Sequence, residues 1–177
     1  MTQSPRMKEV SLYGGAAKCM VPSDWVDAST FRDVPDHQEV FMHAYAVGEQ
    51  SVIIEILEYD DKLSDNDAAA YYFNDLANAD GATSAEIDAS KTRVIPVEVF
   101  GASVNRCDVS GVHMKAKLGP SSPTMPVIVL MSVIRAVNIH SDILVTCHGL
   151  PEFASAIESV HRSVADTLRF VDRSLFL

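Results

Sequence analysis

The sequence predicts an α+β protein, an α/β/α sandwich in which helices flank a central and mainly antiparallel β-sheet. Residues 52–58 and 127–138 are apolar at almost every position, so both faces of these two strands must be covered. The other strand-like segments follow one another through short turns, which favours antiparallel pairing. Two helical segments, 65–79 and one that begins near residue 151, lie far apart in the chain and can cover the two faces of the sheet.

Turn residues define the elements of the first third of the chain. Segments 10–13 and 17–21 flank a pair of glycines and predict a hairpin. Cap residues then precede 25–31, for which we expect a short helix. Pro35 fixes its own φ and keeps the preceding residue extended, so a turn comes before the strand that alternation predicts over 38–47.

The middle of the chain begins with a helix signal. Ser64 and Asp67 form a capping-box pattern, with Asp in place of Glu, at the start of the helix predicted over 65–79. Residues 84–99 predict one or two strands, and Pro96 favours a position at the edge of the sheet.

The last third contains the second apolar strand and the second helix. Residues 104–118 predict a strand pair or one long bent strand, and the prolines of 119–126 predict a loop. The strand 127–138 should pair with 142–148 across a short turn. From near Pro151, apolar residues recur every three or four positions, which predicts an amphipathic helix.

Length and charge limit the class of protein. With 177 residues, 47% of them apolar and 21% charged, the chain has the composition of one globular domain, which we expect to span 1–177. Its 14 Lys and Arg against 24 Asp and Glu give a net charge of -10, which argues against nucleic acid or anionic membrane as a partner. Segment 33–88 holds 14 of the acidic residues and one basic residue. This acidity either steers a basic partner or forms an ordinary solvated surface.

The cysteines and the apolar runs indicate an intracellular, soluble protein. Cys19, Cys107 and Cys147 are far apart and form no C-x-x-C pair, so neither a zinc site nor a disulfide framework is predicted. The first ten residues lack the apolar region of a signal peptide. The apolar run 127–134 is too short to span a bilayer.

Asp36 and Glu39 are the carboxylates of most chemical interest, because they lie on either side of a turn-to-strand junction. One interpretation makes them the acid and base of a carboxylate-dependent hydrolase. In the other, Asp36 bonds the amides of its turn and Glu39 is a solvent-facing strand residue. The sequence contains no G-x-S-x-G motif of a serine hydrolase.

Several segments share the order and residue pattern of one known family. The longest is 27–41, Asp-Ala-Ser-Thr-Phe-Arg-Asp-Val-Pro-Asp-His-Gln-Glu-Val-Phe, preceded by 12–16 and Pro22. Shorter blocks follow at 52–58, 72–76, 134–135, 141–146 and 170–176. In this pattern the chain resembles the Mog family, the Ran guanine nucleotide release factors, whereas residues 82–119 carry no recognisable part of it.

The resemblance implies a sandwich fold related to PsbP, the extrinsic photosystem subunit. It also implies a protein of the nucleus and cytoplasm that binds the small GTPase Ran, promotes release of its guanine nucleotide and supports nuclear import. Such a protein is a regulatory binding protein and not an enzyme. We expect a monomer without metal or cofactor, and with neither nucleic acid nor membrane as a partner.

The resemblance also selects the candidate residues. Asp36 and Glu39 match the family's acidic positions for Ran binding, and Asp27, Arg32, Asp33, Gln38 and Trp25 complete the expected contact set. As the only tryptophan, Trp25 suits either an interface or a core. Arg32 either orients one of the two acids or is solvated. The alternatives are the hydrolase that uses Asp36 and Glu39, and a trafficking or scaffold adaptor.

Overall fold

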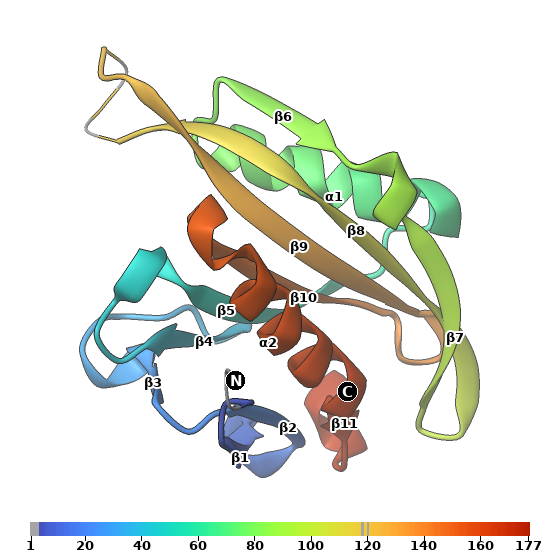
Figure 1. Ribbon diagram of the computed structural model, residues 1–177. Helices are drawn as coiled ribbons and strands as arrows, with labels where there is room; N and C mark the ends of the chain where they lie inside the picture. Colours follow the sequence, from blue (N-terminus) through green and yellow to red (C-terminus); the bar gives the residue numbers. More distant parts are fainter. Residues whose placement is uncertain (1–3, 118, 120) are drawn as a thin grey trace.

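The computed structural model describes residues 4–117, 119 and 121–177. Its main strands are β3 (Trp25–Asp27), β4 (Gln38–His43), β5 (Ser51–Glu58), β6 (Ser84–Ile87), β7 (Arg93–Val99), β8 (Ala102–Ala116), β9 (Thr124–Ala136) and β10 (Ser141–Gly149). Within the described residues they form one eight-stranded antiparallel sheet in the order β3-β4-β5-β10-β9-β8-β6, and β7 pairs with another stretch of β8. Figure 1 shows helix α2 (Ala154–Thr167) across one face of the sheet and helix α1 (Asp65–Ala79) behind the other.

The hydrophobic core lies on both sides of the central strands. Toward α2 it includes Val52, Ile54, Ile143, Val145, Ile157 and Val164. Toward α1 it includes Phe73, Val129, Met131, Val133 and Leu144. Strands β5, β9 and β10 contribute to both clusters, which is why their sequences are apolar at successive positions. The predicted α+β sandwich with its central antiparallel sheet is therefore confirmed.

A second, smaller sheet joins the two ends of the described chain. Strand β1 (Met7–Leu12) pairs with β2 (Ala17–Pro22), and β2 pairs with the short strand β11 (Arg169–Phe170). The β1–β2 hairpin, which the sequence predicts, turns through a 3-10 segment η1 (Tyr13–Gly15). Tyr13 has a φ of 51°, a left-handed conformation that costs a residue with a side chain some energy.

Several local predictions are confirmed. Helix α1 begins after Ser64, whose hydroxyl accepts a hydrogen bond from the amide of Asp67. Pro96 lies in β7, which pairs only with β8 among the described strands and is therefore an edge. Residues 104–116 belong to one long strand, β8, and not to a strand pair. Leu118 and Pro120 of the predicted strand and loop lie outside the described residues.

The prediction of a helix over 25–31 is wrong. Trp25 instead starts strand β3 opposite His43 of β4, and a 3-10 turn η2 (Ala28–Thr30) follows. Pairing with β4 buries Trp25, whose exposed fraction is 2%. The tertiary contact therefore outweighs the local preference.

The bounds of two other elements also differ from the prediction. Strand β4 ends at His43 because Ala46 and Gly48 have left-handed φ values of 50° and 62°. Helix α2 starts at Ala154, after a 3-10 turn η6 (Pro151–Phe153), and ends at Thr167. No helix in the described part of the chain is long and apolar enough to cross a membrane.

Candidate partner-binding site

The candidate residues lie along the edge of the main sheet formed by β3 and β4. Strand β3 pairs only with the C-terminal half of β4, from Phe41 to His43. The N-terminal half, from Gln38 to Val40, has no strand on that side among the described residues. The turn that contains Asp36 leads into this uncovered half. The edge therefore brings the candidate acids close to the surface.

Glu39 is half-buried and has a structural partner. Its Oε1 atom accepts a hydrogen bond of 2.5 Å from the backbone amide of Tyr13 in the η1 turn. The hydroxyl of Tyr13 donates in turn to the carbonyl oxygens of His37 and Ile54, at 3.2 and 3.0 Å. Burial raises the pKa of the Glu39 carboxyl, the Tyr13 amide lowers it, and the negative charge of Asp27 raises it further. The interpretation of Glu39 as a purely solvent-facing residue is therefore wrong.

Asp36 is exposed and differs from Glu39 in having no partner. Within the described residues its carboxylate makes neither a hydrogen bond nor an ion pair. The turn is closed by the backbone instead, because the amide of Gln38 donates to the carbonyl oxygen of Pro35 at 2.9 Å. The carboxylate of Asp36 does not stabilise its own turn and is free to meet a partner.

The remaining polar candidates have different surroundings. The carboxylate of Asp27 caps η2 by accepting the amide of Ser29 at 2.8 Å. The side-chain amide of Gln38 donates to Glu55 at 2.9 Å on the α1 side of the sheet. Arg32 and Asp33 are exposed and form no ion pair with any described residue. Arg32 therefore does not orient the two acids in this structure.

Trp25 does not belong to the exposed site. Its exposed fraction of 2% places it in the core between the sheet and α2. The expectation that it contacts a partner is therefore not supported. An exposed aromatic side chain between β3 and β4 is Phe31, with an exposed fraction of 59%. No local sequence pattern distinguishes an exposed from a buried phenylalanine, so the exposure of Phe31 could not be predicted.

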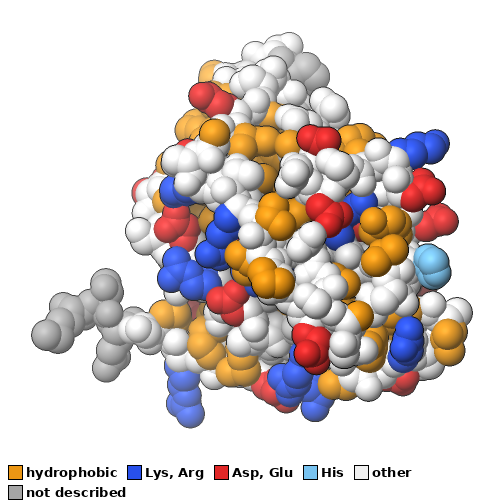
Figure 2. All heavy atoms as spheres, turned by 90° about the vertical axis from the view of Figure 1, so that its right-hand side faces the viewer, with side chains coloured by type: hydrophobic (Ala, Val, Ile, Leu, Met, Phe, Trp, Pro, Cys, Tyr) orange, Lys and Arg blue, Asp and Glu red, His pale blue; other side chains and the backbone are white. Residues whose placement is uncertain are grey.

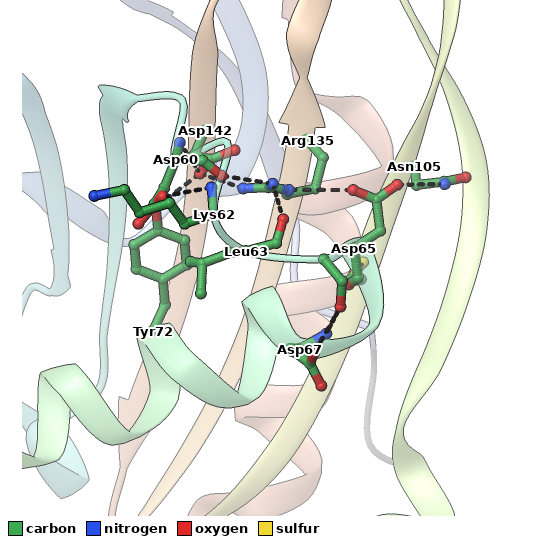
Figure 3. Close-up of polar contacts among 11 residues, drawn as sticks. Asp60, Lys62, Leu63, Asp65, Asp67, Tyr72, Asn105, Arg135 and Asp142 are labelled. Carbon is green, nitrogen blue, oxygen red and sulfur yellow. Dashed lines mark hydrogen bonds and ion pairs between the residues drawn. The ribbon is translucent and has the colours of Figure 1, made fainter.

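A buried ionic network fixes the acidic segment that follows β5. Arg135 is 2% exposed, and its Nη1 atom donates to Asp142 at 2.6 Å. Its Nη2 atom donates to the carbonyl oxygens of Asp60 and Leu63 at 2.9 and 2.7 Å, and Nε reaches Asp65 at 3.2 Å. Figure 3 shows these contacts between β9, β10 and the start of α1. Arg135 and Asp142 are cross-strand partners in the hairpin that the sequence predicts, and this signal could have revealed the pair.

This network places further acids at the same end of the sheet as Asp36. The amide of Ile56 donates to the carbonyl oxygen of His37, so the end of β5 lies beside the Asp36 turn. Glu58 and Asp61, which follow along the chain, are exposed. The exposed acids of this end, Asp33, Asp36, Glu58 and Asp61, are called the acidic rim below.

The cavities give no support to a hydrolase that uses Asp36 and Glu39. Four of the most prominent cavities in the described part of the chain are lined by other residues. A substrate-binding site needs a concave surface around its reacting groups. The two acids lie at a sheet edge instead, which suits contact with a macromolecule.

Comparison with known proteins gives a consistent family match. Residues 10–149 match the family described as Ran-interacting Mog1 protein. The Ran guanine nucleotide release factor of Danio rerio is 34% identical over an alignment of 153 positions that covers 84% of this chain and 80% of that protein. The nuclear import protein mog1 of Schizosaccharomyces pombe is 32% identical over an alignment of 186 positions that covers 95% of this chain and 96% of that protein.

Solved structures share the fold. The Ran-binding protein Mog1p of Saccharomyces cerevisiae has a TM-score of 0.71 at 26% identity, with 98% of this chain and 100% of that chain covered. Cyanobacterial PsbP from Synechocystis has a TM-score of 0.63 at 12% identity, with 96% and 95% covered, and this likeness concerns the fold alone.

Proposed function

Because this chain belongs to the family of Ran-interacting Mog1 proteins, we propose that it binds the small GTPase Ran, promotes release of its guanine nucleotide and supports nuclear protein import. One observation carries the proposal beyond family membership. The exposed carboxylate of Asp36 has no partner among the described residues and stands three residues from half-buried Glu39 at an uncovered sheet edge. Such an edge offers negative charge to a basic partner surface.

We place the contact surface on the acidic rim and on Phe31. Phe31 supplies an exposed aromatic ring of the kind that anchors protein interfaces. Around it, the acidic rim supplies charge that attracts a basic partner and orients it. Glu39, held by the amide of Tyr13, presents its carboxylate from a fixed position at the border of the rim.

The charge of this surface suggests how nucleotide release is promoted. GTPases hold the phosphates of their nucleotide with a lysine and Mg²⁺, both of them cationic. We propose that Asp36 and Glu39 attract such a cationic group and so weaken its hold on the phosphates. Coupling of this kind is reciprocal, so bound nucleotide must weaken the binding of this protein to Ran by the same factor. No covalent step on this chain is required, and we therefore propose a regulatory role without an enzymatic site. The proposed role in nuclear import places the protein in the nucleus and cytoplasm.

The test compares Asp36→Lys with Asp75→Lys. Both positions are exposed acids without a partner among the described residues, but Asp75 lies on α1, away from the proposed surface. The two variants carry the same change in net charge. Loss of a charge pair that becomes buried on binding typically costs about 2–5 kcal/mol, so we expect Asp36→Lys to lower the affinity for Ran about 30-fold or more. Nucleotide release should slow in parallel while the melting temperature stays unchanged.

The control variant should keep the affinity and release rate of the unmodified chain. If Asp36→Lys binds Ran as tightly as the unmodified chain does, the proposed site is wrong. Binding of another protein in place of Ran, with full dependence on Asp36, would favour the adaptor role.

A further inference from the structure

A cavity of about 350 Å³ lies on the α2 face of the sheet, between α2 and the start of β7, with β8 as its floor. Four strand spacings separate β4, which carries Glu39, from β8, a distance of about 19 Å. Figure 2 looks onto the β7 side of the molecule, where basic side chains gather next to acidic ones. The cavity is therefore separate from the proposed Ran surface.

The charge that lines this cavity is opposite to that of the whole chain. Its basic side chains are Lys91, Arg93, Arg106 and Arg162, and its acidic ones are Asp108 and Glu158. The lining thus carries a net charge of +2, against -10 for the whole chain. His161 also lines the cavity, and burial lowers its pKa to about 4, so it is neutral at pH 7. A positive cavity in an acidic protein favours an anion.

The floor of the cavity is fixed by its own ion pairs. Asp108 accepts hydrogen bonds from Nε of Arg106 at 3.0 Å, Nε of Arg93 at 2.9 Å and the hydroxyl of Ser132 at 2.6 Å. Arg106 is 2% exposed and also donates to Asp166 at 2.9 Å. The acid at the floor is therefore fully engaged, and the guanidinium groups beside it are held before any ligand arrives.

Several donors that face the cavity remain without an acceptor. Ser110 lines the cavity and is 8% exposed, yet its hydroxyl has no hydrogen-bond partner among the described residues. Arg162 is exposed and makes no ion pair within the described ranges. Arg93 bonds Asp108 through Nε, which leaves its two Nη groups for another acceptor. These donors belong to three different elements, α2, β7 and β8, and so surround a common volume.

We propose that this cavity binds the phosphate group of a phosphate monoester. Two guanidinium groups and a hydroxyl match the several acceptor oxygens of such a group, and arginine binds phosphate in a bidentate manner. The net charge of +2 on the lining attracts a doubly charged phosphate more strongly than a singly charged carboxylate ligand. A cavity of about 350 Å³ is also at the lower end of the usual range for small ligands, so a phosphate and part of its ester group fit.

The test measures binding of inorganic phosphate to the full chain by calorimetry, with chloride at equal ionic strength as the reference. Arg162→Gln removes an exposed and unpaired charge, so the fold should remain intact. The matched control is Arg6→Gln, because Arg6 is exposed and its side chain has no ion pair in the described part of the chain. Only Arg162→Gln removes a charge-assisted hydrogen bond to the bound phosphate. We expect saturable binding that Arg162→Gln weakens about tenfold or more and Arg6→Gln leaves unchanged.

Ser110→Ala provides a second variant without a change of charge, and it should weaken binding as well. No saturable response beyond that of chloride, or an equal loss in Arg6→Gln, would overturn the proposal. O-phosphoserine and guanosine monophosphate identify the source of the phosphate. If O-phosphoserine binds more tightly than inorganic phosphate, the site is supported and its ligand is a phosphorylated protein. If guanosine monophosphate binds more tightly than inorganic phosphate, the site is supported and its ligand is a nucleotide. None of these results depends on Ran.

Discussion

Asp36 and Glu39 are three residues apart but differ in what their carboxylates do. Glu39 holds the amide of Tyr13, which stands in a left-handed conformation, whereas Asp36 has no partner in the described structure. A substitution at Glu39 therefore changes both the fold and the surface charge, and one at Asp36 changes the charge alone.

This difference gives a prediction for stability. We expect Glu39→Lys to lower the free energy of unfolding by about 1–3 kcal/mol, because a backbone amide loses its acceptor. Asp36→Lys should leave it unchanged. Glu39→Gln keeps an acceptor oxygen and should lie between the two. Urea unfolding of the three variants measures these effects, and equal stability of Glu39→Lys and Asp36→Lys would show that the Tyr13 contact contributes nothing.

Buried histidines should make stability depend on pH. Burial lowers the pKa of His148 and of His161 to about 4 in each case, against an ordinary value of 6.5. The unfolded chain therefore binds more protons than the folded chain between these values. The free energy of unfolding therefore has its full value above pH 6.5. It decreases as pH falls toward 4, by up to about 2.7 kcal/mol per pH unit for the two histidines together.

Urea unfolding at several pH values between 7 and 4 measures this slope. His161→Gln keeps a donor for Ser132, which lies 3.0 Å from the ring of His161, and removes one titrating group. Its slope should be smaller than that of the unmodified chain by up to about 1.4 kcal/mol per pH unit. A slope that is the same in both proteins would assign the pH dependence to other groups.

At the scale of elements, Arg135 joins β9, β10 and the start of α1. Replacing one member of a buried pair leaves the other charge without compensation, which typically costs about 3–5 kcal/mol. We therefore expect Arg135→Leu to destabilise the protein by about this amount, because Asp142 is fully buried. The double variant Arg135→Leu/Asp142→Leu should recover most of the loss. Urea unfolding of both variants is the measurement, and a double variant no more stable than the single one would contradict this account.

Elements that are stabilised locally could be predicted from the sequence, and those that depend on distant contacts could not. The cap at Ser64 and the apolar runs in β5, β9 and β10 carry their own signals. Residues 25–27 form a strand only because β4 lies beside them, and β11 exists only because β2 is available. For the candidate site, the resemblance of 27–41 to the family selected Asp36 and Glu39, whose role in binding stays a prediction. The contact between Tyr13 and Glu39 joins the η1 turn of the small sheet to β4 of the main sheet, and no sequence pattern showed it.

At the scale of the whole molecule, the acidity of segment 33–88 is only partly concentrated. Asp33, Asp36, Glu58 and Asp61 form the acidic rim at one end of β4 and β5. Other acids of the segment lie elsewhere, and some of them have local partners, such as Asp80, which pairs with Lys115. The rim is therefore a local concentration of exposed acids that can steer a basic partner.

This distribution predicts how salt affects binding. Screening acts over about 30 Å at 0.01 M and about 8 Å at 0.15 M ionic strength, so the association rate with Ran should fall across this range. The dissociation rate should change much less. Stopped-flow measurements of the association rate test this. The double variant Glu58→Gln/Asp61→Gln should reduce the salt dependence of the association rate more than the control Asp67→Asn/Asp75→Asn does. An association rate that does not change with salt would exclude steering by the rim.

The small sheet of β1, β2 and β11 also allows the order of the chain to be changed. Phe170 lies opposite Ala17, the amide of Val171 donates to the carbonyl oxygen of Ala16 at 2.8 Å, and Figure 1 shows β1, β2 and β11 together at one end of the molecule. A flexible linker of about ten residues, which spans roughly 17 Å on average, would join β11 to β1 in a rearranged chain. A circular permutant that opens at the exposed turn of Gly81 should then keep every strand pair, with β11 and β1 covalently continuous.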